Sequence, residues 1–408
     1  MNFFSSTQTN KPSYKKDRRK KDHTKPFKRR ENTAAKTKQA DALDHRLFVK
    51  KAVPKEQVHY LPSREIGDLP LDNRLKTNLI KKGYTHPTEI QDKTLEALLQ
   101  GRDLLGIAQT GTGKTGAFLT PLINRLIGTK PAFQVLVVVP TRELAVQIEQ
   151  EFKSITKGLN LYSACFIGGT SLGKDLAILR RSTHVVIGTP GRLTDLSRQG
   201  ALHFSRFTTL VLDEFDRLLD MGFKRDIQYI SQAMTTREQT ALFSATEAKS
   251  QRPLIQELLT DPFEIRVSSG NTTGDHIDQE IVKVGSGENK TEILIRMIRD
   301  ESFQKGIVFA ETKRGVNLLC KKLQEAGVKA DMIHGNKTQN YRLKVLNDFK
   351  TGKIRVLIAT DVAARGLDIL EVSHVINYQQ PKNFDSYIHR IGRTGRAGKA
   401  GKAYTFVN

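Results

Sequence analysis

Hydrophobic and polar positions follow two different patterns along the chain, and the change comes near Leu61. Apolar residues recur at positions 71, 75, 79 and 80, which predicts an amphipathic helix that ends at Gly83. After this helix, short continuous apolar runs alternate with helical patterns. Such runs are typical of parallel strands that are covered on both faces by helices.

The predicted strands form two series, separated by a polar segment. The strands are expected at residues 104–108, 135–139, 185–187, 210–213, 240–244, 306–310, 330–334, 356–360, 374–378 and 403–407. Residues 268–275 are small, polar and rich in turn formers, which indicates a linker. We therefore predict an α/β fold with two domains, over residues 61–267 and 278–408, joined by a linker at 268–277. Ligands are expected in a cleft where the strand carboxyl ends of the two sheets face each other.

Residues 1–60 have no periodic apolar face, which predicts a disordered tail. The chain has 408 residues and a formal net charge of +23, and its first 40 residues hold 13 basic and only 3 acidic side chains. This excess points to an anionic partner such as nucleic acid. The tail is either merely solubilising or a nonspecific polyanion tether, and we favour the tether.

No apolar run approaches the roughly 18 residues of a membrane helix, and residues 135–139 form one of the longest runs. The first residues also lack the charged and apolar regions of a secretory signal. These patterns predict a cytoplasmic protein without a membrane partner.

A phosphate-binding loop is predicted at Ala108-Gln-Thr-Gly-Thr-Gly-Lys-Thr115, between a strand and a helix. Gly111 and Gly113 allow backbone N–H groups to wrap phosphates at the helix N-terminus. Lys114 is expected to meet the β- and γ-phosphates of ATP, and Thr115 to offer its hydroxyl to Mg²⁺. Thr110 and Thr112 complete the loop.

Two consecutive carboxylates, Asp213 and Glu214, follow the apolar run that begins at Leu210. In a protein with a phosphate-binding loop, this position suits Asp213 for holding Mg²⁺ through water and Glu214 for orienting an attacking water. The sequence thus predicts a nucleoside triphosphatase.

From about Leu61 onward, the chain resembles the DEAD-box ATP-dependent RNA helicases, especially the short bacterial-type members. The stretch from Gly83 to Gln91 is similar to the family's adenine-reading Q motif, although Ile66 stands where the family usually has an aromatic residue. The motif that names the family reads Asp213-Glu-Phe-Asp216, with Phe215 in place of alanine. Further stretches in family order are Pro-Thr-Arg-Glu-Leu-Ala at 140–145, Thr-Pro-Gly-Arg at 189–192 and His-Arg-Ile-Gly-Arg-Thr-Gly-Arg at 389–396.

The resemblance implies two tandem RecA-like domains and assigns roles to residues. It implies that Gln91 recognises adenine and that Gly366 and Asp368 face the nucleotide from the second domain. It implies that the γ-phosphate is reached by Arg393 and Arg396. It implies RNA contacts, to phosphates and 2′-hydroxyls, from Pro140, Thr141, Arg142, Gly168, Gly169, Thr189, Arg192, Gln339, Arg342, Thr360 and Asp361. Coupling between the domains is implied for Asp216, Ser244, Thr246 and His389.

The function implied is RNA-stimulated ATP hydrolysis that drives local, non-processive unwinding of short duplexes or remodelling of ribonucleoproteins, with little sequence specificity. ATP and Mg²⁺ are the expected cofactors, RNA the expected partner, and a monomer the expected state. Two alternatives stay open: a DNA-translocating helicase of the wider superfamily, and a non-enzymatic RNA clamp, which Ile66 and Phe215 would permit.

Overall fold

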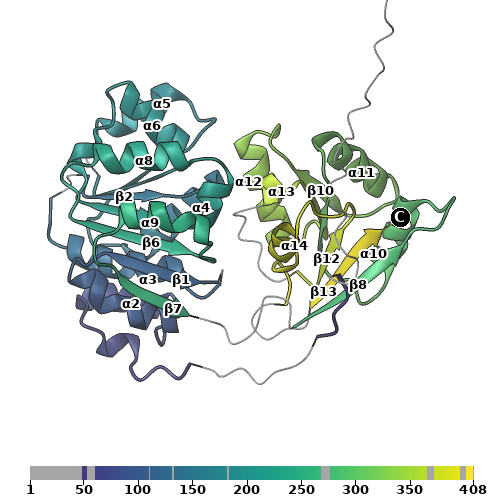
Figure 1. Ribbon diagram of the computed structural model, residues 1–408, viewed down its shortest axis with the longest axis horizontal. Helices are drawn as coiled ribbons and strands as arrows, with labels where there is room; N and C mark the ends of the chain where they lie inside the picture. Colours follow the sequence, from purple (N-terminus) through teal and green to yellow (C-terminus); the bar gives the residue numbers. More distant parts are fainter. Residues whose placement is uncertain are drawn as a thin grey trace, which may run out of the picture. The chain divides into compact units, whose positions relative to one another are not determined.

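The computed structural model describes residues 48–52, 60–109, 111–130, 133–181, 183–267, 276–364, 372–395 and 401–407. Within them, strands form two separate sheets of seven and six strands, and helices cover both faces of each sheet (Figure 1). This arrangement confirms the predicted α/β class.

The first sheet has the strand order β3-β4-β2-β5-β6-β1-β7, and its recorded pairs are all parallel. Its strands are β1 Leu104–Ala108, β2 Val135–Val138, β3 Ser163–Phe166, β4 Val185–Gly188, β5 Thr209–Leu212, β6 Gln239–Ser244 and β7 Phe263–Val267. The apolar runs predicted β1, β2, β4, β5 and β6. The prediction missed β3 and β7 because both lie at an edge of the sheet and alternate between covered and more exposed positions.

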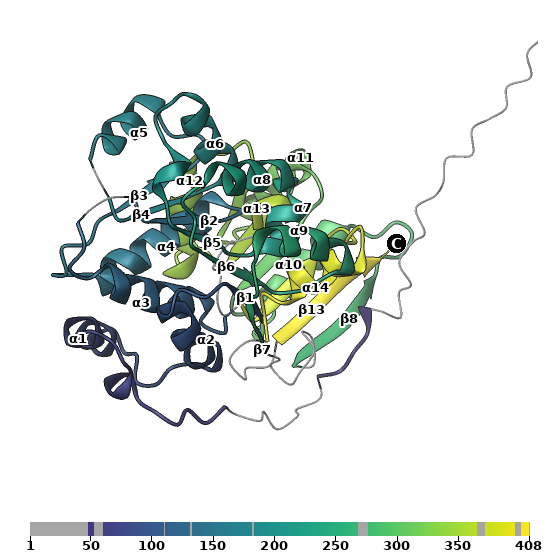
Figure 2. The same cartoon turned by 60° about the vertical axis from the view of Figure 1, so that its left-hand side comes forward.

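Two groups of helices cover the first sheet, one group on each face (Figure 2). One face carries α1 Asn73–Lys81, α2 Glu89–Leu99, α3 Lys114–Leu126 and α4 Arg142–Ile155. The other carries α5 Leu172–Leu179, α6 Pro190–Arg198, α7 Phe215–Asp220, α8 Lys224–Ala233 and α9 Arg252–Leu258. The predicted amphipathic helix is α1, where Leu75 and Leu79 are buried and the Asp72 carboxylate caps the helix by accepting the Arg74 N–H at 2.8 Å.

The second sheet has the order β10-β11-β9-β12-β13-β8. Its strands are β8 Ile277–Lys283, β9 Gly306–Phe309, β10 Ala330–Ile333, β11 Val356–Ala359, β12 His374–Asn377 and β13 Gly401–Val407. Its helices are α10 Lys290–Arg299, α11 Lys313–Glu325, α12 Gln339–Lys350, α13 Asp361–Ala364 and α14 Phe384–Ile391. Helices α10 and α11 pack on one face, and α12 and α13 on the other. Strand β8 was not predicted, because its polar positions break the apolar run.

The first sheet ends with β7 at Val267 and the second begins with β8 at Ile277, so the expected linker lies between two separate sheets. Its residues 268–275 lie outside the described part of the chain. The predicted disorder of residues 1–60 is wrong for residues 48–52, where Phe48 is fully buried and Lys50 pairs with Gln279 of β8. Apolar contacts distant in the sequence order this stretch, and a local pattern does not reveal them.

Among the described helices, none combines the length and apolar composition that a membrane crossing requires.

Candidate nucleotide and nucleic-acid sites

The predicted phosphate loop lies between the carboxyl end of β1 and the start of α3. Gly111 and Gly113 have φ angles of 89° and 95°, a left-handed backbone that glycine adopts without strain. The buried Lys114 ammonium donates to the Ala108 carbonyl at 2.7 Å, which holds this side chain over the loop. The helix N-terminus and the lysine place positive charge at one point, as phosphate binding requires.

Two hydroxyl side chains flank this lysine. Thr112 donates its hydroxyl to the Gln109 carbonyl at 2.8 Å and closes the turn. Thr115 is the second residue of α3 and is half-buried. Thr110 lies outside the described residues.

Gln91 connects the start of α2 to the phosphate loop. Its Nε2 donates to the Gly113 carbonyl at 3.1 Å, and its Oε1 accepts the Thr88 N–H at 3.0 Å. A Cβ on Gly113 would stand 2.7 Å from this Nε2, so only glycine leaves room for the contact. Gln91 also lines a pocket with Tyr84 and the buried Ile66.

The two motif carboxylates follow β5, which neighbours β6 and then β1 in the sheet. Asp213 is 3% exposed, and burial raises the pKa of its carboxyl to about 6, against the opposing effect of Lys114. Glu214 adopts a left-handed backbone with a φ of 51°, which is uncommon for a residue with a side chain. Backbone strain of this kind clusters at functional sites, which marks Glu214 as a candidate functional residue.

Sequence reasoning missed Arg217 as a partner of Glu214. Its Nη1 donates to both Glu214 carboxylate oxygens, at 2.7 Å and 2.8 Å, and the two residues are 4% and 8% exposed. The spacing of three residues at the start of α7 was the available signal. The carboxylate is therefore held by a buried charged hydrogen bond.

Two residues of the Asp213–Asp216 motif point in different directions. The Phe215 ring is fully buried in the core beneath the sheet, in the same cluster as Leu218, so the larger side chain in place of alanine is accommodated by packing. Asp216 Oδ2 accepts the Thr246 hydroxyl at 3.2 Å, and the Asp216 N–H donates to Ser244 Oγ at 3.3 Å. The structure thus brings together the three residues predicted to couple motifs in this domain.

The RNA-binding candidates of the first domain gather where β2, β4 and β3 end, next to one another in the sheet. Thr141 caps α4 by accepting the Leu144 N–H at 3.3 Å, and Pro140 precedes it. The Arg142 guanidinium lies against the glycine doublet, because a Cβ on Gly169 would stand 2.5 Å from its Nη1 and one on Gly168 3.0 Å from its Nη2.

Thr189 and Arg192 lie at the start of α6, directly after β4. Arg192 Nε donates to the buried Asp175 carboxylate at 2.8 Å, and its Nη2 donates to the Thr170 carbonyl at 3.2 Å. The charge of this arginine is therefore partly balanced by Asp175, a residue that sequence reasoning did not single out.

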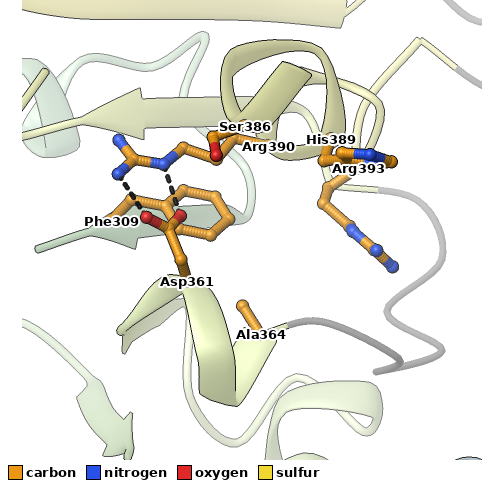
Figure 3. Close-up of a pocket in the computed structure, with 7 residues that line it drawn as sticks. All are labelled: Phe309, Asp361, Ala364, Ser386, His389, Arg390 and Arg393. Carbon is orange, nitrogen blue, oxygen red and sulfur yellow. Dashed lines mark hydrogen bonds and ion pairs between the residues drawn. The ribbon is translucent and has the colours of Figure 1, made fainter. Parts of the chain in front are cut away.

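In the second domain, Thr360 and Asp361 follow β11. Both Asp361 oxygens accept from Arg390, at 2.6 Å from Nε and 2.8 Å from Nη2, and the guanidinium lies over the Phe309 ring (Figure 3). Arg390 was also missed by sequence reasoning. The Asp361 carboxylate is thus committed to holding α14, in addition to any contact with nucleic acid.

The remaining candidates of the second domain lie on α12 and around α14. Gln339 begins α12, and Arg342 on the same turn donates from Nη2 to the Ala363 carbonyl at 3.4 Å. His389 and Arg393 line the pocket that Figure 3 shows, together with Arg390. Gly366, Asp368 and Arg396 lie outside the described residues.

The sequence matches the DEAD/DEAH box helicase family over residues 88–253 and the helicase conserved C-terminal domain over residues 289–398. The chain is 41% identical over 343 residues to the DEAD-box ATP-dependent RNA helicase CshA of Streptococcus pneumoniae, covering 84% of this chain and 65% of CshA. The chain belongs to the DEAD-box helicase family.

Solved structures of other DEAD-box helicases have the same fold. S. cerevisiae Dbp5 bound to RNA and ADP BeF3 aligns with a TM-score of 0.76 and 29% identity, over 85% of this chain and 90% of Dbp5. Mss116p bound to ssRNA and AMP-PNP aligns with a TM-score of 0.75 and 30% identity, over 86% of this chain and 76% of the Mss116p chain. The two sheets are thus tandem RecA-like domains, as predicted. The chain spans just under two thirds of the length of CshA.

Within the DEAD-box family, the two departures noted in the sequence now have a structural setting. Ile66 is 3% exposed and packs in the core of the first domain while lining the Gln91 pocket. Phe215 lies in the core on the opposite face of the same sheet. Neither substitution removes a charged or hydrogen-bonding group from the phosphate loop or from the Asp213–Asp216 motif.

Proposed function

We propose that this chain is an RNA-stimulated ATPase that unwinds or remodels short RNA structures. One observation supports this most directly: the carboxyl edge of the first sheet divides into two halves. The ends of β1, β5 and β6 carry the phosphate loop, the motif carboxylates and Ser244, whereas the ends of β2, β4 and β3 carry the nucleic-acid candidates. A single rigid sheet therefore holds both groups of residues.

The nucleotide site uses groups that suit a Mg²⁺–triphosphate. Lys114 and the N-terminus of α3 would bind the phosphates, and Gln91 would read adenine. The hydroxyl and carboxylate oxygens of Thr115 and Asp213 are ligands that Mg²⁺ accepts, partly through water, and they would hold it. Bound there, the ion would neutralise charge that develops on the phosphates.

Glu214 would orient the water that attacks the γ-phosphate. Its left-handed backbone and its hydrogen bonds from Arg217 fix the direction of the carboxylate. Fixed geometry matters here because phosphoryl transfer depends mainly on positioning and charge stabilisation.

RNA would be held through its backbone. Thr141, Arg142, Thr189 and Arg192 and the glycine doublet offer hydroxyl, guanidinium and N–H donors, and Gln339, Arg342, Thr360 and Asp361 would add contacts from the second domain. Donors of this kind bind phosphates and 2′-hydroxyls without reading base edges. We therefore expect preference for RNA over DNA and weak sequence specificity.

The second domain would complete the reaction. Gly366 and Asp368 would face the nucleotide, and Arg393 and Arg396 would reach the γ-phosphate, with His389 coupling the domains. An arginine supplied in this way is worth about 10³–10⁵ in rate, so hydrolysis would require the domains to close. Closure on one strand would displace the other, and ATP and RNA would raise each other's affinity by the same factor.

Two substitutions test the proposal. Lys114→Ala should abolish ATP binding, because it removes the cation of the phosphate site. Glu214→Gln should keep ATP and RNA binding but stall hydrolysis, because the amide cannot activate water. Binding would be followed with a fluorescent ATP analogue and turnover by single-turnover phosphate release. Undiminished hydrolysis in either variant would contradict the assigned roles.

The type of nucleic acid that stimulates ATP hydrolysis distinguishes the proposed function from the two alternatives. ATPase activity should be stimulated by poly-RNA and much less by single-stranded DNA. Equal stimulation by DNA would favour a DNA-translocating helicase, and no phosphate release with either polymer would favour a non-enzymatic clamp. A monomeric mass by light scattering would agree with the expected state, and localisation in the cytoplasm stays a prediction.

A further inference from the structure

Residues 48–52 pair with the outer strand of the second sheet. Lys50 N–H donates to the Gln279 carbonyl at 3.1 Å and Gln279 N–H to the Lys50 carbonyl at 2.7 Å, an antiparallel bridge against β8. Ala52 N–H donates to Asp278 Oδ1 at 3.0 Å. Because β8 is the last strand of its sheet, this segment covers an edge (Figures 1 and 2).

Phe48 extends the contact from β8 to α14. Its ring is fully buried and meets the Tyr387 ring edge to face, with centroids 4.8 Å apart. Ile277 and Ile391 belong to the same apolar cluster, and Tyr387 Oη donates to Gln279 Oε1 at 2.8 Å. One aromatic side chain from far upstream thus completes the packing between β8 and α14.

Helix α14 presents a different set of residues to the pocket of Figure 3. Ser386 and Arg390, four residues apart, line the pocket of Figure 3, and Arg393 follows two residues after the helix ends. Tyr387 and Ile391, also four residues apart, face the Phe48 cluster instead. The Phe48 cluster and the pocket therefore lie on different sides of α14. The placement of the helix fixes where the buried Arg393 lies, two residues beyond its end.

We propose that residues 48–52 act as a strap that holds α14 in place, and that Phe48 is a positioning residue for Arg393. The consequence for hydrolysis rests on the proposed function, whereas the effect on α14 does not. The strap works through packing: removing a buried ring leaves a cavity into which surrounding groups relax only partly. A displaced α14 would carry Arg393 away from the transition state, where errors of about 1 Å cost on the order of 10²-fold in rate.

The first experiment compares Phe48→Ala with Val49→Ala in the full chain. Val49 lies on the same segment and is 57% exposed, so shortening its side chain controls for effects of a substitution in this segment that do not involve burial. We expect Phe48→Ala to lower kcat of the RNA-stimulated ATPase by roughly 10–100-fold with KM for ATP unchanged, because Arg393 acts in the transition state. Phe48→Met, which fills most of the volume, should restore most of the rate. Equal kcat values for Phe48→Ala and Val49→Ala would overturn the proposal.

The second experiment uses amide hydrogen exchange without nucleotide or RNA. Exchange in α14 and β8 should be faster in Phe48→Ala than in Val49→Ala, while α10 and α11 on the opposite face of the sheet stay protected. Unchanged exchange in α14 would overturn the strap, whatever the ATPase activity. Conversely, a wild-type chain without RNA-stimulated ATPase would contradict the proposed function and leave this result standing. If Phe48→Ala fails to fold, Phe48→Leu takes its place, with an intermediate effect expected in both assays.

Discussion

At the scale of single residues, the site depends on charges that are buried in pairs. Glu214 and Arg217 are nearly inaccessible and share two short hydrogen bonds. In the second domain, the buried Arg390 pairs with Asp361, whose side chain is 26% exposed. A buried charge is costly unless its partner is present. We therefore expect the partner of the proposed catalytic carboxylate to contribute both to activity and to folding.

Arg217→Met tests this dependence. It leaves Glu214 buried without its partner, so the free energy of unfolding of the first domain should fall by about 3–5 kcal/mol, measured by chemical denaturation. Arg252→Met is the matched control, because the Arg252 side chain is 63% exposed in its pair with Glu247 and such pairs contribute about 0–1 kcal/mol. Equal effects of the two substitutions would show that burial of the pair does not matter.

The proposed role of Asp213 in holding Mg²⁺ predicts a pH dependence of ATP hydrolysis. Burial raises the pKa of its carboxyl to about 6, so protonation competes with Mg²⁺ as the pH falls through that value. We expect kcat/KM for ATP to decline below about pH 6, and a higher Mg²⁺ concentration to move this decline to lower pH, since the cation favours the ionised form. A pH profile whose midpoint did not respond to Mg²⁺ would contradict the assignment.

At the scale of elements, the edges of the sheets behave differently from their centres. Central strands such as β2 and β11 are buried along their whole length and appear in the sequence as apolar runs. Edge strands β7 and β8 are partly exposed, and their polar residues interrupt the apolar runs from which central strands are predicted.

In the second sheet, the ring of His374 on β12 stacks between Phe303 and Tyr404, at centroid distances of 4.7 Å and 6.0 Å.

His374 makes the second domain sensitive to acid. Burial, with the nearby Lys402 ammonium, lowers the pKa of His374 from 6.5 to about 4. The unfolded chain then binds a proton that the folded chain does not, so the free energy of unfolding should fall as the pH drops from about 6.5 to 4. Thermal unfolding of His374→Phe should show a flatter pH dependence over this range. The control is His203→Gln, an exposed position in the first domain, and it should keep the slope of the wild type.

At the level of the whole molecule, we expect the basic tail and the strap to make separate contributions, the first to RNA affinity and the second to the placement of α14. The first 40 residues hold a net charge of +10, whereas the strap begins at the fully buried Phe48. Charge acts on RNA affinity through counterion release, and packing acts on the geometry of α14. N-terminal deletions that end before the strap or after it can therefore separate the two contributions.

Deleting residues 1–40 should raise the RNA concentration needed for half-maximal ATPase and weaken its salt dependence, with the saturated rate nearly unchanged. Deleting residues 1–52 should also lower the saturated rate, because the strap is lost. Titration of RNA at two salt concentrations measures both quantities. A collapsed saturated rate in the shorter deletion would show that the charged tail does more than tether RNA.

The α/β class, helix α1, most central strands and the motif residues follow from the amino-acid sequence. These features depend on local periodicity or on short spacings such as Gly111-Thr-Gly113-Lys114. Which charges pair depends on the three-dimensional fold, as with Asp361 and Arg390, because partners 29 residues apart leave no local pattern. The order of residues 48–52, assigned to the disordered tail because they lack a periodic apolar face, likewise depends on the fold, since Phe48 is buried by side chains that lie more than two hundred positions downstream.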